Sequence, residues 1–253
     1  MIYSASRRTD MPAFFPDDLV ARVRRSRRLE AIVMWTKDIR NLAAHRGLAW
    51  VVAAVPTVVQ FTVTGLAGTE WEPRVPSLAS QLSELERVAA VLPAGAIQWR
   101  FDPIIPSPDL AERFARVKAN LESAVGRLDR VTVSFPDPYR QAVDRAAAAG
   151  LVWPRLSLGE KKDVLAMMTA AFPGVEAPIR LCCEPALLDA PGVAMARCVD
   201  GELFEELYGL PLGGLEKDAG QRKACGCVKS TDIGSYAMRC PHRCLYCYAN
   251  PDT

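Results

Sequence analysis

Short apolar runs alternate with amphipathic segments along most of the chain, and this alternation limits the fold more than any other feature. The runs are brief, apolar or β-branched, and bounded mostly by Pro, Gly or charged residues, as buried strands are. They comprise residues Ile2–Ser6, Ala31–Thr36, Val58–Thr64, Ala96–Phe101, Arg130–Phe135 and Pro178–Cys183. Helical periodicity between the runs marks Asp17–Arg28, Ser77–Leu92, Asp109–Leu121, Arg140–Ala149 and Glu160–Phe172.

Alternation of strand and helix predicts an α/β fold with a parallel sheet and right-handed crossovers. Six such units indicate a partial (βα)6 TIM-like barrel over residues 1–185. A doubly wound open sheet stays a second possibility, because periodicity does not distinguish a closing sheet from an open one. No Gly-x-Gly-x-x-Gly loop follows any of the runs, which argues against a dinucleotide-binding domain.

Residues 186–253 depart from this pattern, and we expect them to form a cysteine-rich, iron-sulfur-binding extension packed on the barrel mouth. A helical stretch at Glu202–Leu207 precedes a Pro- and Gly-containing segment and a polar run. Charged residues stand where a signal peptide needs its apolar core, and no apolar run approaches the roughly 18 residues of a membrane span. The sequence therefore predicts a cytoplasmic protein without a membrane partner.

The eight cysteines carry the strongest chemical signal. A cytoplasmic compartment keeps thiols reduced, so clustered cysteines there favour metal ligation over disulfides. Three of them, Cys240, Cys244 and Cys247, have the spacing Cys-x3-Cys-x2-Cys. Three thiolates on one short loop can hold three irons of a [4Fe-4S] cluster and leave the fourth iron open to another ligand.

Zinc is the competing metal at this loop. A zinc site needs a fourth ligand, and the nearby candidate, His242, is only two positions from Cys240 and from Cys244, an awkward spacing for four tetrahedral ligands. Spacing and context therefore favour iron. The aromatic residues Tyr246 and Tyr248 flank Cys247, where we expect them to cover the cluster or contact a bound cofactor.

The segment Cys240-Pro-His-Arg-Cys244-Leu-Tyr-Cys247-Tyr-Ala resembles the Cys-x3-Cys-x-aromatic-Cys signature of the radical S-adenosylmethionine (SAM) superfamily, and especially its spore-photolyase-like branch. This resemblance implies a partial (βα)6 barrel and a [4Fe-4S] cluster whose open iron chelates the amino and carboxylate groups of SAM. It also implies reductive cleavage of SAM to a 5′-deoxyadenosyl radical, with electrons from a partner such as a flavodoxin or ferredoxin.

The position of the motif departs from that superfamily, in which it usually follows the first barrel strand. Here it follows the sixth predicted strand. Over nearly its full length the chain is similar to an uncharacterised bacterial family with this C-terminal arrangement. The stretches that carry this similarity are Ser6–Asp10, Trp35–Lys37, Trp99–Pro103 and Ser230–Gly234.

The remaining cysteines are sufficient for a second centre. Four thiolates suit either a [4Fe-4S] cluster or a structural zinc ion, and both stay open. Adjacent residues on a strand face opposite sides, so we expect only one of Cys182 and Cys183 to take part, and we choose Cys182. The predicted ligands are Cys182, Cys198, Cys225 and Cys227. Asp232, between the two centres, is expected to bond a neighbouring group or a ribose hydroxyl, or to cap a turn.

Charged side chains at the ends of the predicted strands are the expected lining of a substrate or SAM pocket, because parallel α/β folds place chemistry there. These residues are Arg8, Lys37, Arg100, Asp102 and Glu184. Arg100 lies inside an apolar run, and a buried Arg requires a partner, which we expect to be Asp102, Glu184 or an anionic ligand.

The sequence thus predicts a radical-SAM-type iron-sulfur enzyme acting on an unidentified substrate. Two other classes stay open: an iron-sulfur electron carrier or sensor without SAM chemistry, and a zinc-stabilised nucleic-acid-binding protein. The net charge of +2 gives nucleic acid no independent support. The Arg-rich segment Arg22–Arg28 is better explained as a solvated helix surface, because no aromatic residues are interleaved with it.

Overall fold

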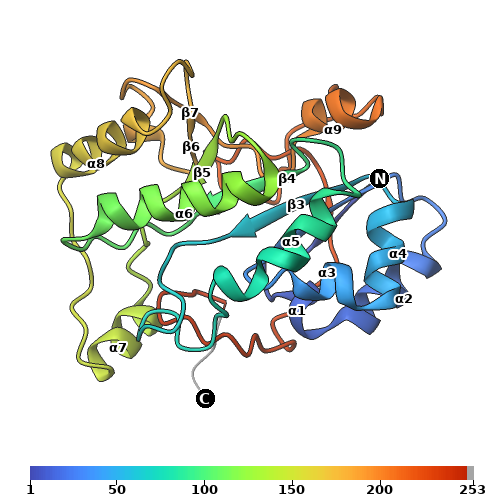
Figure 1. Ribbon diagram of the computed structural model, residues 1–253, viewed down its shortest axis with the longest axis horizontal. Helices are drawn as coiled ribbons and strands as arrows, with labels where there is room; N and C mark the ends of the chain where they lie inside the picture. Colours follow the sequence, from blue (N-terminus) through green and yellow to red (C-terminus); the bar gives the residue numbers. More distant parts are fainter. Residues whose placement is uncertain (250–253) are drawn as a thin grey trace.

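A parallel β-sheet with a layer of helices along it organises the computed structural model, which describes residues 1–249 (Figure 1). Within these residues the sheet has eight strands in the order β7-β6-β5-β4-β3-β2-β1-β8, and every neighbouring pair is parallel. The strands are β1 (Ile2–Ala5), β2 (Ala31–Thr36), β3 (Thr57–Thr62), β4 (Ile97–Phe101), β5 (Val131–Val133), β6 (Ile179–Leu181), β7 (Val193–Met195) and β8 (Thr231–Asp232).

The α/β prediction is confirmed, and each predicted strand corresponds to one of β1 to β6, with β5 and β6 shorter than expected. Two further strands come from residues 186–253, and they extend the sheet at opposite edges: β7 beside β6, and β8 beside β1. From β1 to β7 the strands follow one another in chain order, without the reversal that defines a doubly wound sheet.

The helices connect successive strands. They are α1 (Met11–Phe14), α2 (Pro16–Arg25), α3 (Arg40–Ala44), α4 (Arg46–Ala54), α5 (Leu82–Ala89), α6 (Leu110–Val125), α7 (Arg140–Ala148), α8 (Leu158–Ala170) and α9 (Gly201–Tyr208), with short 3₁₀ turns at Ala79–Gln81 and Pro185–Leu187. The sequence did not predict α1, α3 or α4. The last two are short and separated by His45, whose ring nitrogen Nδ1 accepts a hydrogen bond from the Leu48 backbone N–H and so starts α4.

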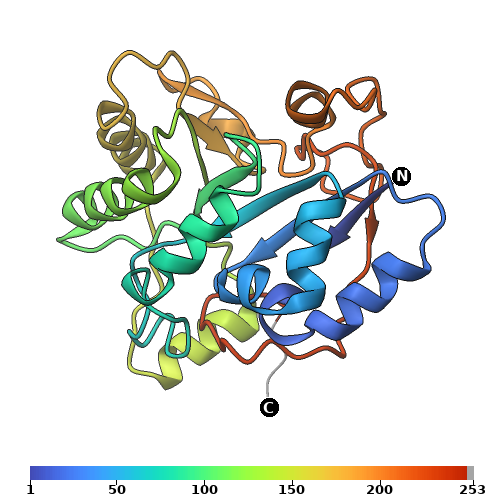
Figure 2. The same ribbon diagram turned by 45° about the vertical axis from the view of Figure 1, so that its right-hand side comes forward.

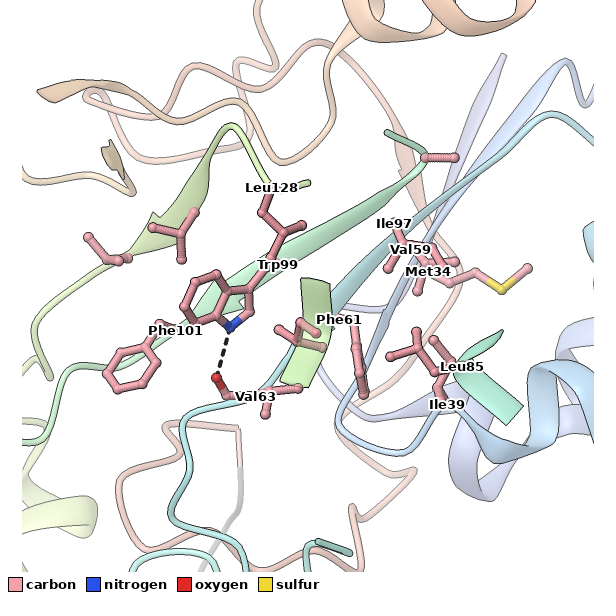
Figure 3. Close-up of a cluster of buried hydrophobic side chains, with 14 of the residues drawn as sticks. Met34, Ile39, Val59, Phe61, Val63, Leu85, Ile97, Trp99, Phe101 and Leu128 are labelled. Atoms are coloured by element: carbon pink, nitrogen blue, oxygen red, sulfur yellow. Dashed lines mark hydrogen bonds between the residues drawn. The ribbon is translucent and has the colours of Figure 1, made fainter. Parts of the chain in front are cut away.

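One face of the sheet packs against this helical layer and forms the main hydrophobic core. Successive helices contact one another along it, α2 with α4, α3 with α5, α5 with α6 and α6 with α8 (Figure 2). Apolar side chains from the strands, including Met34, Phe61, Trp99 and Phe101, fill the space between the layers (Figure 3). The indole N–H of Trp99 donates to the Val63 carbonyl at 3.0 Å, so this polar group does not remain unsatisfied in the core.

The opposite face of the sheet receives the segment that follows β7. Ile2, Val33 and Val58 project there and pack with α9 residues such as Phe204. Side chains alternate across each strand, so Gln60, two positions after Val58, lies on this same face. Arg100 lies there too, because it is two positions after Gln98, which pairs with Gln60 on the neighbouring strand. No helix within residues 1–249 is both long and apolar enough to cross a bilayer.

The chain after β8 returns along the carboxyl ends of the strands. This red segment passes beneath α1 and continues toward α7 in both ribbon views (Figures 1 and 2). It contains Cys240, Cys244 and Cys247. The sheet therefore presents one cysteine group at its carboxyl ends and another on the face opposite the main helical layer.

Candidate functional site

Five cysteines from three separate segments meet on the second face of the sheet, and we call them the five-cysteine group: Cys182, Cys183, Cys198, Cys225 and Cys227. Their thiols interact in a closed ring, in which each side chain is next to two others. The interaction with Cys183 raises the pKa of Cys182 to about 12. Interactions with Cys198 and then Cys225 lower the pKa of Cys227 far below its ordinary value. Negative charge in this group is thus favoured at Cys227.

Cys183 joins this group although the alternation rule selected Cys182 alone. Strand β6 ends at Leu181, so neither Cys182 nor Cys183 is a strand residue. The Cys182 N–H still donates to the Val133 carbonyl at 2.9 Å, whereas Cys183 adopts a left-handed backbone conformation with φ of 60°. This turn brings the Cys183 thiol beside both Cys182 and Cys225. The alternation rule does not apply to this pair, because it holds only within a strand; which of the two cysteines ligates a metal stays a prediction.

Two arginines approach the five-cysteine group from different strands. The Arg100 Nη1 donates to the Cys198 Sγ at 2.8 Å, and its Nη2 donates to an Asp102 carboxylate oxygen. Arg7 follows β1 and lies over the Trp35 ring, 5.2 Å from its centroid. Burial opposes the charge of each guanidinium, but the nearby thiols, with Asp102 in the case of Arg100, raise both pKa values overall. Both cations therefore stay charged beside the thiols.

The three motif cysteines lie together at the carboxyl ends of β1 to β3. Burial raises the pKa of Cys244, and the proximity of Cys247 and Cys240 raises it further. The Cys247 N–H donates to the Cys244 carbonyl at 3.1 Å, which closes the end of the loop. Arg243, just before Cys244, has a left-handed φ of 53°. The loop thus turns three thiols toward one region from only eight residues of chain.

His242 anchors this loop to the sheet. Its Nε2 lies 3.0 Å from the Asp10 carboxylate and its Nδ1 lies 3.3 Å from the Arg74 carbonyl oxygen. Asp10 also accepts hydrogen bonds from the Thr36 hydroxyl and the Lys37 backbone N–H. Both imidazole nitrogens therefore face oxygen acceptors, and neither is directed at a thiol. This arrangement does not support His242 as a fourth zinc ligand.

A buried carboxylate anchors the aromatic residue of the motif. The Glu72 Oε1 accepts hydrogen bonds from the Tyr246 hydroxyl, from the Thr64 hydroxyl at 2.7 Å and from the Lys37 ammonium at 2.8 Å. Burial opposes ionisation of Glu72, but Lys37 and these hydrogen bonds lower its pKa overall. Lys37 also lies 5.5 Å from the centroid of the Tyr246 ring. Tyr246, which lies between Cys244 and Cys247 in the sequence, is thus fixed beside an ion pair.

Helix α7 and the start of the chain hold the remainder of the motif. The Arg145 Nη2 donates to the Leu245 carbonyl at 3.3 Å and to the Cys247 carbonyl at 2.6 Å. The Tyr248 hydroxyl donates to the Arg7 carbonyl at 2.7 Å. The motif is thereby attached to the loops after β1, β2 and β3 and to a helix after β5.

Three predicted pocket residues lie between the two cysteine groups. Lys37 is close enough to Cys244 and to Asp102 for both to raise its pKa, although burial opposes this. Asp102 accepts hydrogen bonds from Arg100 and from the Ser134 hydroxyl. Cations and anions thus alternate from Cys244 through Lys37, Asp102 and Arg100 to Cys198. Charged groups with this spacing can orient a polar ligand placed between the cysteine groups.

The other predicted residues make different contacts. Glu184 accepts a hydrogen bond from the Phe135 N–H at 3.1 Å and lies 3.6 Å from the Lys161 ammonium, so it joins the ends of β5 and β6 to α8. Arg8 donates to the Gly234 carbonyl at 3.2 Å. Asp232, on β8, accepts hydrogen bonds from the Arg7 N–H at 3.1 Å and the Gly234 N–H at 2.9 Å. Arg8 and Asp232 thus connect β1 to the segment leading to the motif.

A shallow apolar cavity of about 630 Å³ lies beside the motif and not between the cysteine groups. Trp71, Val143 and Trp153 are among the residues that line it. The Leu245 N–H donates to the Trp71 carbonyl at 3.0 Å, and Tyr246 packs against the same aromatic cluster. This cavity has little polar lining, which distinguishes it from the charged region between the groups.

Neither cysteine group is arranged as a metal site among the residues that the structure describes. Within residues 1–249, no three His, Cys, Asp or Glu side chains already stand in an arrangement that could hold a metal ion. Thiols must also lose their protons to ligate, and metal sites commonly complete their geometry only on binding. The two cysteine groups therefore offer donors of the kind that binds iron or zinc, but in this structure their thiols are not arranged around a metal position.

Sequence reasoning proposed Lys37, Arg100 and Asp102 as site residues, which the structure places between the two cysteine groups, but it assigned no role to several residues that hold the groups. These are Arg7, Asp10, Glu72, Arg145 and Cys183. The only sequence signal for Asp10 and Glu72 was their position after the end of a predicted strand. Arg7 had the same signal but could not be separated from its neighbour Arg8.

A family model described as "Domain of unknown function (DUF1848)" matches residues 20–249. No curated protein and no solved structure matches the chain.

Proposed function

The chain belongs to this family of unknown function, DUF1848, and we propose that the protein is a radical-SAM-type iron-sulfur enzyme acting on an unidentified substrate. The observation that carries the proposal is the position of the Cys-x3-Cys-x2-Cys loop, which folds back over the carboxyl ends of β1 to β3 and beside the charged residues there. The sequential order of β1 to β7 supports a partial barrel, although the extra strand β8 beside β1 extends its first edge.

The donor sets fit the proposed cofactors. Three thiols on one loop, with the nearby imidazole bound elsewhere, suit a [4Fe-4S] cluster that keeps one iron for an outside ligand. When bound there with SAM, such a cluster supplies the electron that breaks the sulfonium C5′–S bond, releasing methionine and a 5′-deoxyadenosyl radical. A flavodoxin or ferredoxin is the class of partner that would provide this electron.

The five-cysteine group fits a second metal centre bound entirely by protein ligands. Its surroundings provide a second argument, because the Arg7 guanidinium interacts with the Cys227 side chain while its Nη2 atom is buried without a hydrogen-bond partner in residues 1–249. A buried, unpaired cationic donor is costly unless it faces negative charge. A [4Fe-4S] cluster or a zinc ion held by four thiolates supplies such charge.

The residues of this chain have defined tasks in this proposal. Lys37, Asp102 and Arg100 lie where they would bind and orient the charged ends of SAM or a polar substrate between the two cysteine groups. Glu72 keeps Lys37 charged and holds Tyr246 in place. Helix α7 and the apolar cluster under Tyr246 would exclude water from one side of the motif.

Anaerobic purification and reconstitution with iron and sulfide test the proposal. We expect a brown protein that, when chemically reduced, converts SAM to 5′-deoxyadenosine. Cys244→Ala should abolish this product, while the metal bound by the five-cysteine group remains. Ser235→Ala, in an exposed turn of the same returning segment, is a matched control that should retain cleavage.

Two results would overturn the proposal. A brown protein that never cleaves SAM would indicate an electron carrier or sensor, and a colourless protein with stoichiometric zinc would indicate a structural metal. Cleavage retained by Cys244→Ala would refute the assignment of the open-iron cluster.

A further inference from the structure

Arg7 contacts the five-cysteine group and the residue that follows the motif through different parts of the same residue. Its carbonyl accepts a hydrogen bond at 2.7 Å from the hydroxyl of Tyr248, the residue after Cys247. Its guanidinium lies next to Cys227 and Cys198 in the five-cysteine group. Its backbone N–H donates to Asp232, on the strand that precedes the motif. Arg7 thus stands where the sheet, the five-cysteine group and the motif meet.

The guanidinium is held in a fixed position but is incompletely satisfied. The Nη1 donates to the Ser4 hydroxyl at 3.2 Å, and the planar group lies over the Trp35 ring. The Nη2 atom is buried and has no hydrogen-bond partner in the part of the chain that the structure describes, although the guanidinium as a whole interacts with the Cys227 side chain. A guanidinium immobilised in this way is preorganised for an anionic group that completes its hydrogen bonds.

Charge balance indicates which anion this is. Four thiolates around Zn²⁺ or a [4Fe-4S]²⁺ core carry a net charge of two negatives, because four negative ligands surround two positive charges. Arg100 supplies one compensating charge through its 2.8 Å hydrogen bond to the Cys198 Sγ. Asp102 offsets this charge because it pairs with the same guanidinium. Further positive charge is therefore needed beside the thiols, and Arg7 reaches them from the segment after β1.

We propose that Arg7 is a positioning residue that stabilises a metal centre in the five-cysteine group with its guanidinium and links this centre to the motif through Tyr248. This inference rests on the proposed second metal centre. It does not depend on SAM chemistry. Loading of the five-cysteine group would complete the hydrogen bonds of the Arg7 guanidinium and so stabilise this residue further, and the Arg7 carbonyl would in turn stabilise the segment that carries Cys247.

Arg8 offers a matched control because it is adjacent, has the same charge and faces elsewhere. Its Nη1 donates to the Gly234 carbonyl, and its guanidinium lies 5.2 Å from the Tyr236 ring centroid. The test uses the full chain carrying Cys244→Ala, so that bound metal reports on the five-cysteine group. Into this chain we would introduce Arg7→Gln, Arg7→Lys or Arg8→Gln, reconstitute anaerobically, and measure iron per chain and its rate of loss to a chelator.

Outer contacts of metal ligands are typically worth about 10–100-fold in metal affinity. We therefore expect Arg7→Gln to lose iron about 10–100-fold faster than the Cys244→Ala chain and Arg8→Gln to lose it at the same rate. Arg7→Lys should fall between them, because it keeps the charge but not the two-pronged geometry. Metal-free thermal unfolding of each variant separates this effect from a general loss of stability.

Equal retention by Arg7→Gln and Arg8→Gln would overturn the role of Arg7 while leaving the second centre intact. If the Cys244→Ala chain held neither iron nor zinc, the second centre itself would be refuted and the inference with it. The link to the motif has its own readout, hydrogen exchange of residues 244–249. Metal loading should slow this exchange in the Arg8→Gln chain but not in the Arg7→Gln chain, and equal slowing in both would refute the link.

Discussion

The two cysteine groups differ in how the chain assembles them. The motif takes its thiols from one loop of eight residues, whereas the five-cysteine group draws on the end of β6, the segment after β7 and the segment before β8. The motif is anchored through neighbouring residues, His242 and Tyr246, to buried carboxylates. The five-cysteine group is approached directly by guanidinium groups. A short loop with indirect anchors suits a site that must leave a ligand position open, and a group closed by tertiary structure suits full protein ligation.

The largest contrast concerns spare ligands. The motif has three thiols and none to spare, so replacing any one of them by Ala should abolish 5′-deoxyadenosine formation. The five-cysteine group has one thiol more than a four-ligand centre requires. In the Cys244→Ala chain, further single Ala replacements in this group should remove the metal at four positions and spare it at one. Metal per chain from elemental analysis measures this, and metal loss at all five positions would contradict it.

The next contrast concerns the ion pair under the motif. Glu72→Gln keeps the shape of the side chain but leaves the Lys37 ammonium buried without its anion, with both side chains less than a sixth exposed. Loss of one partner from a buried pair costs about 3–5 kcal/mol. We expect urea unfolding of the metal-free protein to show a loss of this size. The exposed neighbour substitution Glu70→Gln should change little, and an equal loss in both variants would show that the pair is not responsible.

The same variant has a predictable pH dependence. The folded-state pKa of Glu72 is below 4.5 and that of Lys37 is above 10.5, because each stabilises the charge of the other against burial. Stability from Glu72 is therefore present above about pH 4.5 and lost as pH falls through its folded pKa, and stability from Lys37 is lost as pH rises through its own. The stability difference between wild type and Glu72→Gln should be constant between these limits and shrink below pH 4.5. A difference that persisted in acid would contradict the assignment.

A smaller effect is expected when only the hydroxyl of the motif aromatic residue is removed. Tyr246→Phe loses the hydrogen bond to the Glu72 carboxylate, and hydrogen bonds to charged groups are worth about 1.5–3 kcal/mol. We expect a stability loss of that order and reduced SAM cleavage, with unchanged metal content in the five-cysteine group. A lower metal content in that group would show that metal binding there depends on the motif, which the contacts do not indicate.

The smallest effect should spare both regions. Ser157 caps α8 through a reciprocal pair of hydrogen bonds with Glu160. Ser157→Ala should cost about 1 kcal/mol of stability, the typical value for a lost N-cap. Metal content and SAM cleavage should remain at wild-type levels. A change in either would indicate that metal binding responds to global stability and would weaken every comparison above.

The sequence was informative where the chemistry is local. Runs such as Ala31–Thr36 are apolar up to a final Thr and bounded by charged residues, so the strand was predicted with its observed limits. Strand β8 has only Thr231 and Asp232, both polar, and pairs with β1 through tertiary contact that no local pattern contains. The same distinction holds in the site. Arg100 stood out inside an apolar run, and it does pair with Asp102.

Other parts of the site depend on contacts between distant residues. Nothing adjacent to Glu72 indicates that Tyr246 would be its partner, and nothing adjacent to Asp10 indicates His242. Arg7 and Arg8 are indistinguishable in sequence, and only the direction of the chain after β1 decides which one faces the thiols. The left-handed turn at Cys183 was similarly invisible, because it depends on where β6 stops.

The pairing of β1 with β8 also has a consequence for biosynthesis. Ser4 and Asp232 are 228 positions apart, yet their strands are neighbours. Strand β1 is synthesised long before β8, so the β1 edge of the sheet stays unpaired while the intervening helices and strands fold. The loop with Cys240, Cys244 and Cys247 emerges later still. The cluster that we propose for this loop can therefore be inserted only after Cys247 has been synthesised, and a nascent chain that stops before Cys240 has none of its ligands.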